Sequence, residues 1–129
     1  YTKQFMQMYE KLKAVGIEHC FLIGIGAYNG TADDICYNEI RNAQYSFAEH
    51  RKDITVVSRL FETMKARGLI KDSFHYYQAG YNEVGKDAAI NTAKYVLTNV
   101  LLIQKSTSNR TIKYDARCCF YFHLKLIIP

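Results

Sequence analysis

Two short apolar runs on either side of a segment with helical periodicity constrain the fold of this chain most strongly. The first run covers residues 19–25 and the second covers residues 53–58. Neither run alternates apolar with polar residues, which is typical of strands buried on both faces. The segment between them, residues 31–50, repeats apolar residues at helical spacing, and its predicted inward face carries Cys36, Ile40, Ala43 and Phe47. Strand, helix and strand in this order predict a βαβ unit with two parallel strands and a right-handed crossover.

Helical spacing recurs on both sides of this unit. The predicted apolar face of residues 2–15 carries Phe5, Met8, Leu12 and Val15. Gly16 follows directly, where a left-handed helix end is expected. Residues 78–99 repeat a second set at the same spacing, namely Tyr81, Val84, Ala88, Thr92, Tyr95 and Val96. Gly80 and Gly85 are expected to let this second helix pack closely near its start.

The character of the sequence changes after Asn99. Residues 105–111 are polar, whereas residues 118–128 are rich in aromatic and aliphatic side chains that favour strands. The sequence therefore predicts an α/β domain over residues 1–99 and an atypical, β-prone tail over residues 100–129. The tail is either an added edge strand or sequence foreign to the original protein.

Composition limits the classes of partner. With 129 residues, of which 49% are hydrophobic, the chain is long enough for one domain with a core. The formal net charge is +5, but the basic residues are scattered and the longest basic run is Arg51 and Lys52. Since a nucleic-acid-binding surface needs clustered basic residues, we expect no nucleic-acid partner. No stretch reaches the roughly 18 apolar residues of a membrane span, and no signal peptide opens the chain, so no membrane partner is expected.

The four cysteines, at positions 20, 36, 118 and 119, match no zinc or redox spacing. We expect Cys20 and Cys36 to be buried thiols. Cys118 and Cys119 supply, together with His123, three loosely spaced metal ligands, but a β-rich tail explains these residues better. We therefore expect neither a metal nor a cofactor.

One segment carries a pattern that suits catalysis. Asp72 precedes His75 by three residues in a predicted loop, residues 69–77, that follows the βαβ unit. In an open α/β sheet, functional loops collect at the carboxyl ends of the strands, where this loop is expected to emerge. If Asp72 accepts the Nδ1 proton of His75, Nε2 is left free to take a proton from a serine hydroxyl. The same spacing is common in surface pairs without function, so the pattern alone predicts geometry rather than activity.

The surroundings of this pair resemble the terminal block of the SGNH hydrolases. Residues 72–85 read DSFHYYQAGYNEVG, which is similar to the D-x-x-H-Y, G-Y and G pattern of the sialate O-acetylesterase and acetylxylan esterase-like branch. The matching residues are Asp72, His75, Tyr76, Gly80, Tyr81 and Gly85. Residues 40–44, IRNAQ, are similar to the I-R-x-A-Q helix of that branch. The resemblance covers residues 4–97.

The resemblance implies a role for each matched residue of the loop. His75 would be the general base, and Asp72 would orient it. Tyr76 and Tyr77 would line a pocket for the acyl group or the sugar. The substrate would be an acylated carbohydrate, and the location of the protein would be extracytoplasmic or secreted.

The resemblance also implies a fold. Residues 1–99 would be the C-terminal portion of a flavodoxin-like three-layer α/β/α sandwich with parallel strands. In that portion, Arg41 and Gln44 would either hold their helix against neighbouring loops or lie on an exposed helical edge.

The chain departs from the family in what it lacks. The G-D-S or G-Q-S nucleophile block and the Gly and Asn blocks of the oxyanion hole are absent, and the serines at positions 46, 58, 73, 106 and 108 lie in other contexts. Without a nucleophile and oxyanion donors, most of the rate enhancement of acyl transfer is lost. We therefore expect the base-carrying part of a serine esterase, inactive alone and completed by a missing N-terminal half or a homo-oligomeric partner. The alternative is a non-catalytic α/β module for binding or assembly.

Overall fold

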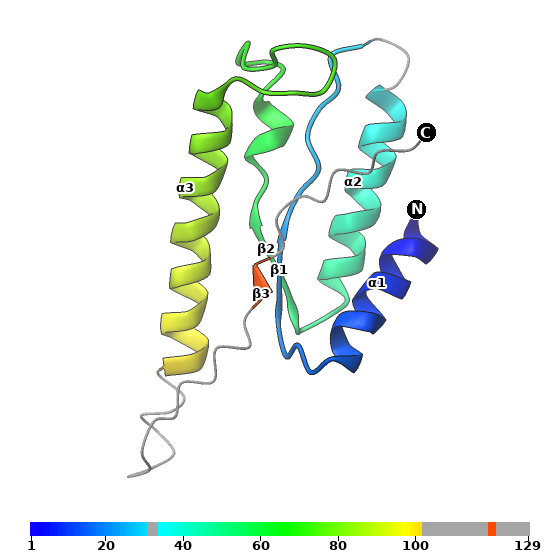
Figure 1. Ribbon diagram of the computed structural model, residues 1–129, viewed down its shortest axis with the longest axis vertical. Helices are drawn as coiled ribbons and strands as arrows, with labels where there is room; N and C mark the ends of the chain where they lie inside the picture. The colour runs from blue at the N-terminus through cyan, green and yellow to red at the C-terminus, as the bar shows by residue number, and fades with distance from the viewer. Residues whose placement is uncertain (31–33, 102–118, 121–129) are drawn as a thin grey trace.

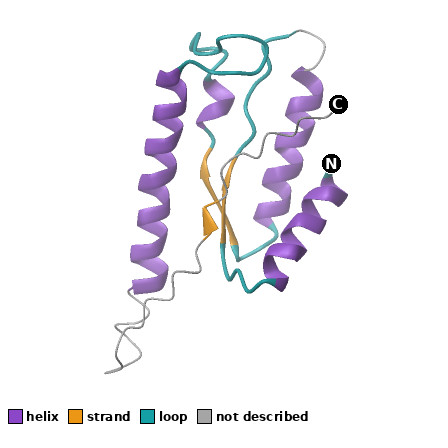
Figure 2. Cartoon of the chain, in the orientation of Figure 1, coloured by secondary structure: helices purple, strands orange, loops and turns teal. Residues whose placement is uncertain are grey.

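The computed structural model describes residues 1–30, 34–101 and 119–120, which form a mixed α/β fold (Figure 1). Its elements in chain order are α1 Thr2–Ala14, β1 Cys20–Ile23, α2 Asp34–Glu49, β2 Ile54–Ser58, the 3-10 helix η1 Leu60–Thr63, α3 Gln78–Tyr95, the π-helix η2 Val96–Leu101 and β3 Cys119–Phe120. Figure 2 shows the strands at the centre, with helices on either side of them. No helix in the described part is both long and apolar enough to cross a membrane.

The two apolar runs form adjacent parallel strands, as predicted. Cys20 pairs with Ile54, and the register shifts once, between Leu22 and Ile23. The helix α2 connects the two strands. On the other edge of β1 lies β3, which is also parallel, so the strand order is β2-β1-β3. Apart from β3 and the end of η2, the tail predicted over residues 100–129 lies outside the described residues.

The strand β1 is covered on both faces because its two central side chains point in opposite directions. Leu22 packs with Phe47 and Ala48 of α2, whereas Phe21 packs with Val57 and with Ala88 of α3. Figure 1 shows α1 and α2 on one side of the strands and α3 on the other. Burying a large apolar side chain contributes roughly 1.5–3 kcal/mol, so these two residues hold α2 and α3 against one strand.

A third apolar cluster lies beyond the ends of the strands and supports the loop that follows η1. Phe61, Met64 and Val84 form its buried part, and Tyr76 packs against it. Met64 is completely buried. A Cβ atom added to Gly80 would lie 3.2 Å from the Met64 sulfur, so the predicted close approach at the start of α3 is confirmed.

Gly16 has the predicted left-handed conformation, with a φ of 86° just after α1.

Two predictions about burial are wrong. Cys36 was expected to be a buried thiol but is exposed, whereas Cys20 is half-buried. Val15 was expected on the apolar face of α1 but is 75% exposed. The 16 residues of α2 span about 24 Å, whereas the four residues of β1 span about 13 Å. The first turns of α2 therefore extend beyond the strands, and Cys36 has no sheet to pack against.

The prediction for Gly85 is also wrong, because a Cβ atom at this position would meet nothing within 4 Å. Glycine in a helix interior costs about 0.5–1 kcal/mol relative to alanine. Gly85→Ala should therefore raise the free energy of unfolding by about that amount, as measured by urea denaturation. Gly26→Ala is the matched control and should lower it, since a Cβ atom there would overlap the Tyr76 hydroxyl group. Destabilisation by Gly85→Ala would mean that this side of α3 is covered.

Candidate active site

The Asp72–His75 loop lies at the carboxyl ends of the parallel strands. Because β1 and β2 are parallel, the segments that follow them emerge at the same edge of the sheet. Hydrogen bonds join these segments: among them, the Asn29 amide donates to the Ser73 carbonyl at 2.9 Å, and the Tyr76 hydroxyl donates to the Ala27 carbonyl at 3.0 Å. Figure 1 shows both segments side by side at the top of the molecule, next to the start of α3. The predicted position of the loop is confirmed.

The loop is closed at its base by backbone pairing. Ile70 and Tyr76 form an isolated antiparallel bridge. The Lys71 amide donates to the His75 carbonyl at 2.8 Å, and the Tyr77 amide donates to the Leu69 carbonyl at 2.9 Å. These bonds hold the four residues from 72 to 75 in a tight turn between two fixed ends.

The Asp72 carboxylate organises this turn. Its Oδ1 atom accepts hydrogen bonds from the amides of His75 at 2.9 Å and Phe74 at 3.0 Å. Its Oδ2 atom lies 2.9 Å from Nδ1 of His75, as predicted from the spacing. The backbone amides of His75 and Phe74, followed by the imidazole, lower the pKa of Asp72 to about 2. Asp72 is therefore ionised at neutral pH.

An ionised carboxylate only accepts hydrogen bonds, so Nδ1 of His75 must carry the proton that it shares with Asp72. In the neutral imidazole, Nε2 is then unprotonated and able to accept a proton. No residue of the described part forms a hydrogen bond with Nε2. The side chains of His75 and Asp72 are 42% and 49% exposed, so the pair lies at the surface rather than in a closed pocket.

No serine hydroxyl forms a hydrogen bond with His75 within the described ranges. The Ser58 side chain is buried, and its Oγ atom accepts a bond from the Leu60 amide at 3.3 Å. Ser46 and Ser73 are exposed, on α2 and in the loop itself. Ser106 and Ser108 lie outside the described residues.

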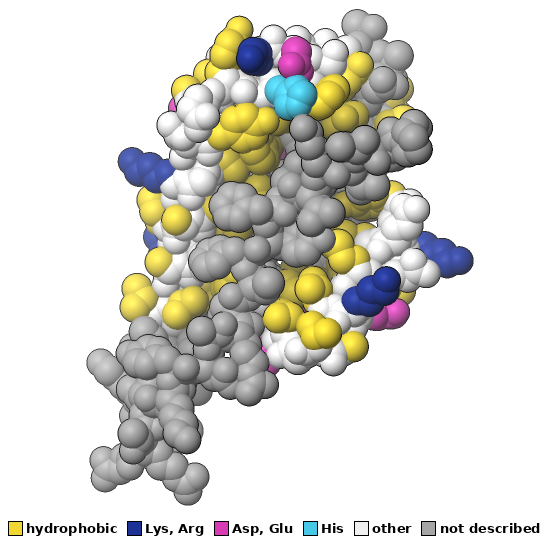
Figure 3. Space-filling view, in the orientation of Figure 1, with side chains coloured by type: hydrophobic (Ala, Val, Ile, Leu, Met, Phe, Trp, Pro, Cys, Tyr) yellow, Lys and Arg dark blue, Asp and Glu magenta, His cyan; other side chains and the backbone are white. Residues whose placement is uncertain are grey.

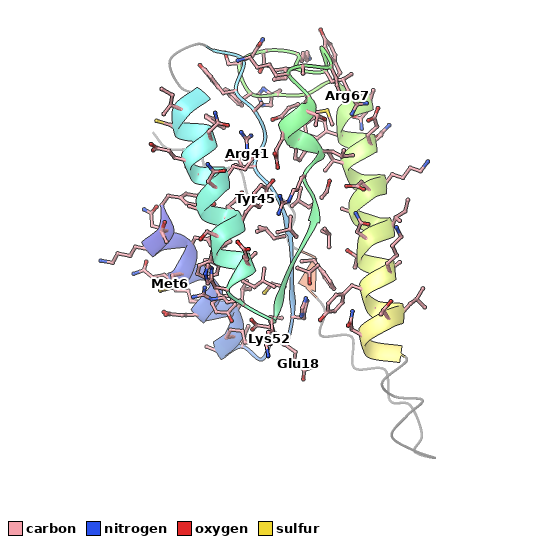
Figure 4. All side chains as sticks on the ribbon, turned by 180° about the vertical axis from the view of Figure 1, so that it is seen from behind. Met6, Glu18, Arg41, Tyr45, Lys52 and Arg67 are labelled. Atoms are coloured by element: carbon pink, nitrogen blue, oxygen red, sulfur yellow. The ribbon has the colours of Figure 1, made fainter. Side chains whose placement is uncertain are left out.

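Two of the polar residues of the IRNAQ segment, Arg41 and Gln44, contact neighbouring segments. Gln44 is buried, and its Oε1 atom accepts a hydrogen bond from the Ile25 amide at 2.9 Å. The Arg41 side chain is 11% exposed, and its Nε atom lies 4.0 Å from Oε2 of Glu62. Gln44 therefore contacts a neighbouring loop and Arg41 contacts η1, so neither side chain lies on an exposed helical edge. In Figure 4, Arg41 lies between α2 and the strands.

A contact that the sequence did not predict connects α2 with η1. The Tyr45 hydroxyl donates a hydrogen bond to Glu62, and the Arg59 guanidinium lies 4.1 Å from the centre of the Tyr45 ring. Burial raises the pKa of Tyr45. Gly24 makes room for this contact, because a Cβ atom at that position would overlap the Tyr45 hydroxyl.

The two tyrosines that were expected to line a pocket differ in their surroundings. Tyr76 stacks on Phe61 with 4.7 Å between ring centres, its hydroxyl is bonded to Ala27, and burial raises its pKa to about 12. Tyr76 therefore packs the loop against the rest of the fold. Tyr77 is 49% exposed at the start of α3, and Phe74 is 52% exposed. Figure 3 shows hydrophobic, basic and acidic side chains gathered around a histidine at the top of the molecule.

The groove that the structure describes lies away from this loop. A groove of about 580 Å³ runs between α2 and β2, and neither Asp72 nor His75 lines it. Within the part of the chain that the structure describes, no group of three or more His, Cys, Asp or Glu residues could hold a metal. Cys118 and His123, the other candidate ligands, lie outside that part.

The chain matches no family model, no curated protein and no solved structure. The resemblance to SGNH hydrolases therefore rests on the motif residues alone.

The pKa of Asp72 tests the hydrogen bonding of this loop. The carboxyl carbon of Asp72 should titrate near pH 2 in an NMR pH series. Since the folded pKa is lowered, ionised Asp72 contributes to stability above about pH 4, and this contribution is lost as the pH falls through the folded value. In His75→Ala the pKa should stay below the ordinary value, because both backbone donors remain. A midpoint near the ordinary value in the unmodified chain would contradict this hydrogen bonding.

Proposed function

We propose that this chain supplies the base half of a serine esterase that removes O-acetyl or other acyl groups from carbohydrates. His75 is the general base and Asp72 orients it. The observation that carries the proposal is the 2.9 Å contact between ionised Asp72 and Nδ1 of His75, beside the carboxyl ends of two parallel strands. The motif residues around the loop supply the substrate class, through their resemblance to carbohydrate esterases.

The chemistry assigns one proton to each step. As a serine Oγ atom attacks the ester carbonyl carbon, Nε2 of His75 takes the hydroxyl proton, and Asp72 stabilises the imidazolium that forms. His75 then gives this proton to the leaving sugar oxygen, which leaves an acyl-serine. A water molecule, deprotonated by His75, then attacks the carbonyl carbon of the acyl-serine. His75 returns the proton to the serine Oγ atom as the bond between the carbonyl carbon and Oγ breaks, and the acyl group leaves as a carboxylic acid.

The nucleophile and the oxyanion donors, in this proposal, lie on a segment outside these 129 residues. That segment completes a flavodoxin-like three-layer sandwich around the parallel strands, either from the same polypeptide or from a second copy. Helices on both faces of β1 support such a sandwich. The buried Nη1 atom of Arg41 supports a further contact, since it has no hydrogen-bond partner within the described part.

A second candidate is a non-catalytic α/β module for binding or assembly that keeps the loop as a scaffold. The lack of any hydrogen bond between His75 and a described serine hydroxyl favours it. Both candidates predict that the chain alone is inactive, so a longer protein is needed to separate them.

The test compares the 129-residue chain with a protein translated from further upstream that contains a G-D-S or G-Q-S block. The chain alone should hydrolyse p-nitrophenyl acetate only at the background rate, whereas the longer protein should hydrolyse it readily. In the longer protein, His75→Ala should lower kcat by roughly 10⁴- to 10⁶-fold, because base and nucleophile act as a unit. Asp72→Asn should lower it by a smaller factor.

Ser73→Ala, in the same loop, is the matched control and should leave kcat unchanged. If the longer protein keeps its activity in His75→Ala, the proposed base is wrong. If the chain alone is active and one of its own serines is required, the nucleophile has been placed wrongly. If the longer protein is inactive although it carries the serine block, the non-catalytic module is favoured.

A further inference from the structure

An exposed aromatic side chain lies directly against the proposed base. The Phe74 ring centre is 4.3 Å from that of His75, with 44° between the ring planes. Phe74 is 52% exposed, although burial of a phenyl ring is energetically favourable. Tyr77, two residues after His75, is 49% exposed. The segment therefore presents two half-exposed aromatic side chains within two residues of His75, and one of them, Phe74, contacts its ring.

The position of Phe74 is held by the same hydrogen bonds that orient His75. Its backbone amide donates to Oδ1 of Asp72 at 3.0 Å, and the neighbouring His75 amide donates to the same atom at 2.9 Å. The bridge between Ile70 and Tyr76 closes the loop below them. These bonds fix the backbone from which the half-exposed Phe74 ring projects.

The order of proton transfers decides which part of an ester lies next to this ring. In acyl transfer, the general base gives its proton to the leaving oxygen, so the leaving group must lie beside Nε2. For an acylated sugar, the leaving group is the sugar itself. A side chain that contacts the His75 ring, as Phe74 does, therefore lies close to the position of the leaving sugar in the proposed reaction.

We propose that Phe74, together with Tyr77, forms the subsite for the sugar ring of the substrate. A pyranose ring has apolar faces of C–H groups that stack on aromatic rings, and its hydroxyl groups remain available to water and to the Tyr77 hydroxyl. The assignment of this subsite to the leaving-group side rests on the proposed function. Stacking itself requires only the exposed rings.

Binding of sugar to the 129-residue chain tests the subsite without any need for hydrolysis. In a ¹H–¹⁵N NMR titration with methyl β-D-xylopyranoside, saturable shifts should centre on the amides of Phe74, His75 and Tyr77. Phe74→Ala and Phe74→Leu should raise the dissociation constant of the xyloside by roughly 2- to 10-fold, as expected for loss of one aromatic contact. Phe74→Tyr should retain it. Leu97→Ala removes an equally exposed apolar side chain from η2 and should leave binding unchanged.

Two small molecules serve as controls for the probe. Glycerol offers hydroxyl groups without a ring, and methyl acetate offers an acyl group without a sugar, so neither should give saturable shifts in this loop. Absence of saturable shifts with the xyloside, equal binding by Phe74→Ala, or equal shifts with methyl acetate would each overturn the subsite.

The test also separates this subsite from the proposed function. Sugar binding at Phe74 in a protein whose longer form has no esterase activity would keep the aromatic subsite and end the esterase proposal. Esterase activity that depends on His75 in a chain that does not bind the xyloside would end only the subsite.

Discussion

The burial of β1 on both faces is the constraint on which the rest of this structure depends. Phe21 and Leu22 are adjacent in sequence but pack into different clusters, one with α3 and one with α2. Parallel pairing with β2 then brings the carboxyl ends of both strands to one edge. The loop that carries Asp72 and His75 is placed at that edge because α3 must return along the face that contains Phe21. The position of the candidate site thus follows from the packing of one four-residue strand.

At the site itself, the Asp72 carboxylate has three connected effects. It accepts hydrogen bonds from two backbone amides, which fix the turn, and a hydrogen bond from Nδ1 of His75, which orients the ring. The same hydrogen bonds keep the carboxylate ionised. An ionised carboxylate cannot donate a hydrogen bond, so the imidazole must be the donor. The orientation and tautomer of His75 and the backbone position of Phe74 therefore depend on one side chain. This shared dependence is why the proposed base and the proposed sugar subsite belong to one small loop.

The parts of the molecule that depend on local sequence could be predicted, and those that depend on relative lengths and distant contacts could not. The parallel strands followed from two short, mainly apolar runs, and the contact between Asp72 and His75 followed from a spacing that one turn can close. The exposure of Cys36 depends on how far α2 extends past the strands, which no periodicity records. Tyr45 and Glu62 are 17 residues apart and belong to different elements, so neither helical nor strand periodicity connects them. The open side of Gly85 depends on which face of α3 remains uncovered.

The tautomer of His75 tests the central claim most directly, because the account requires Nδ1 to carry the proton and Nε2 to be free. Long-range ¹H–¹⁵N correlation spectra of the neutral imidazole distinguish a protonated ring nitrogen from an unprotonated one. We predict that Nδ1 of His75 is protonated and Nε2 is unprotonated in the unmodified chain, and that Asp72→Ala shifts the population toward the Nε2-protonated form. A ring that is mainly protonated at Nε2 in the unmodified chain would contradict the account, since such a ring has no lone pair at Nε2 with which to accept a serine proton.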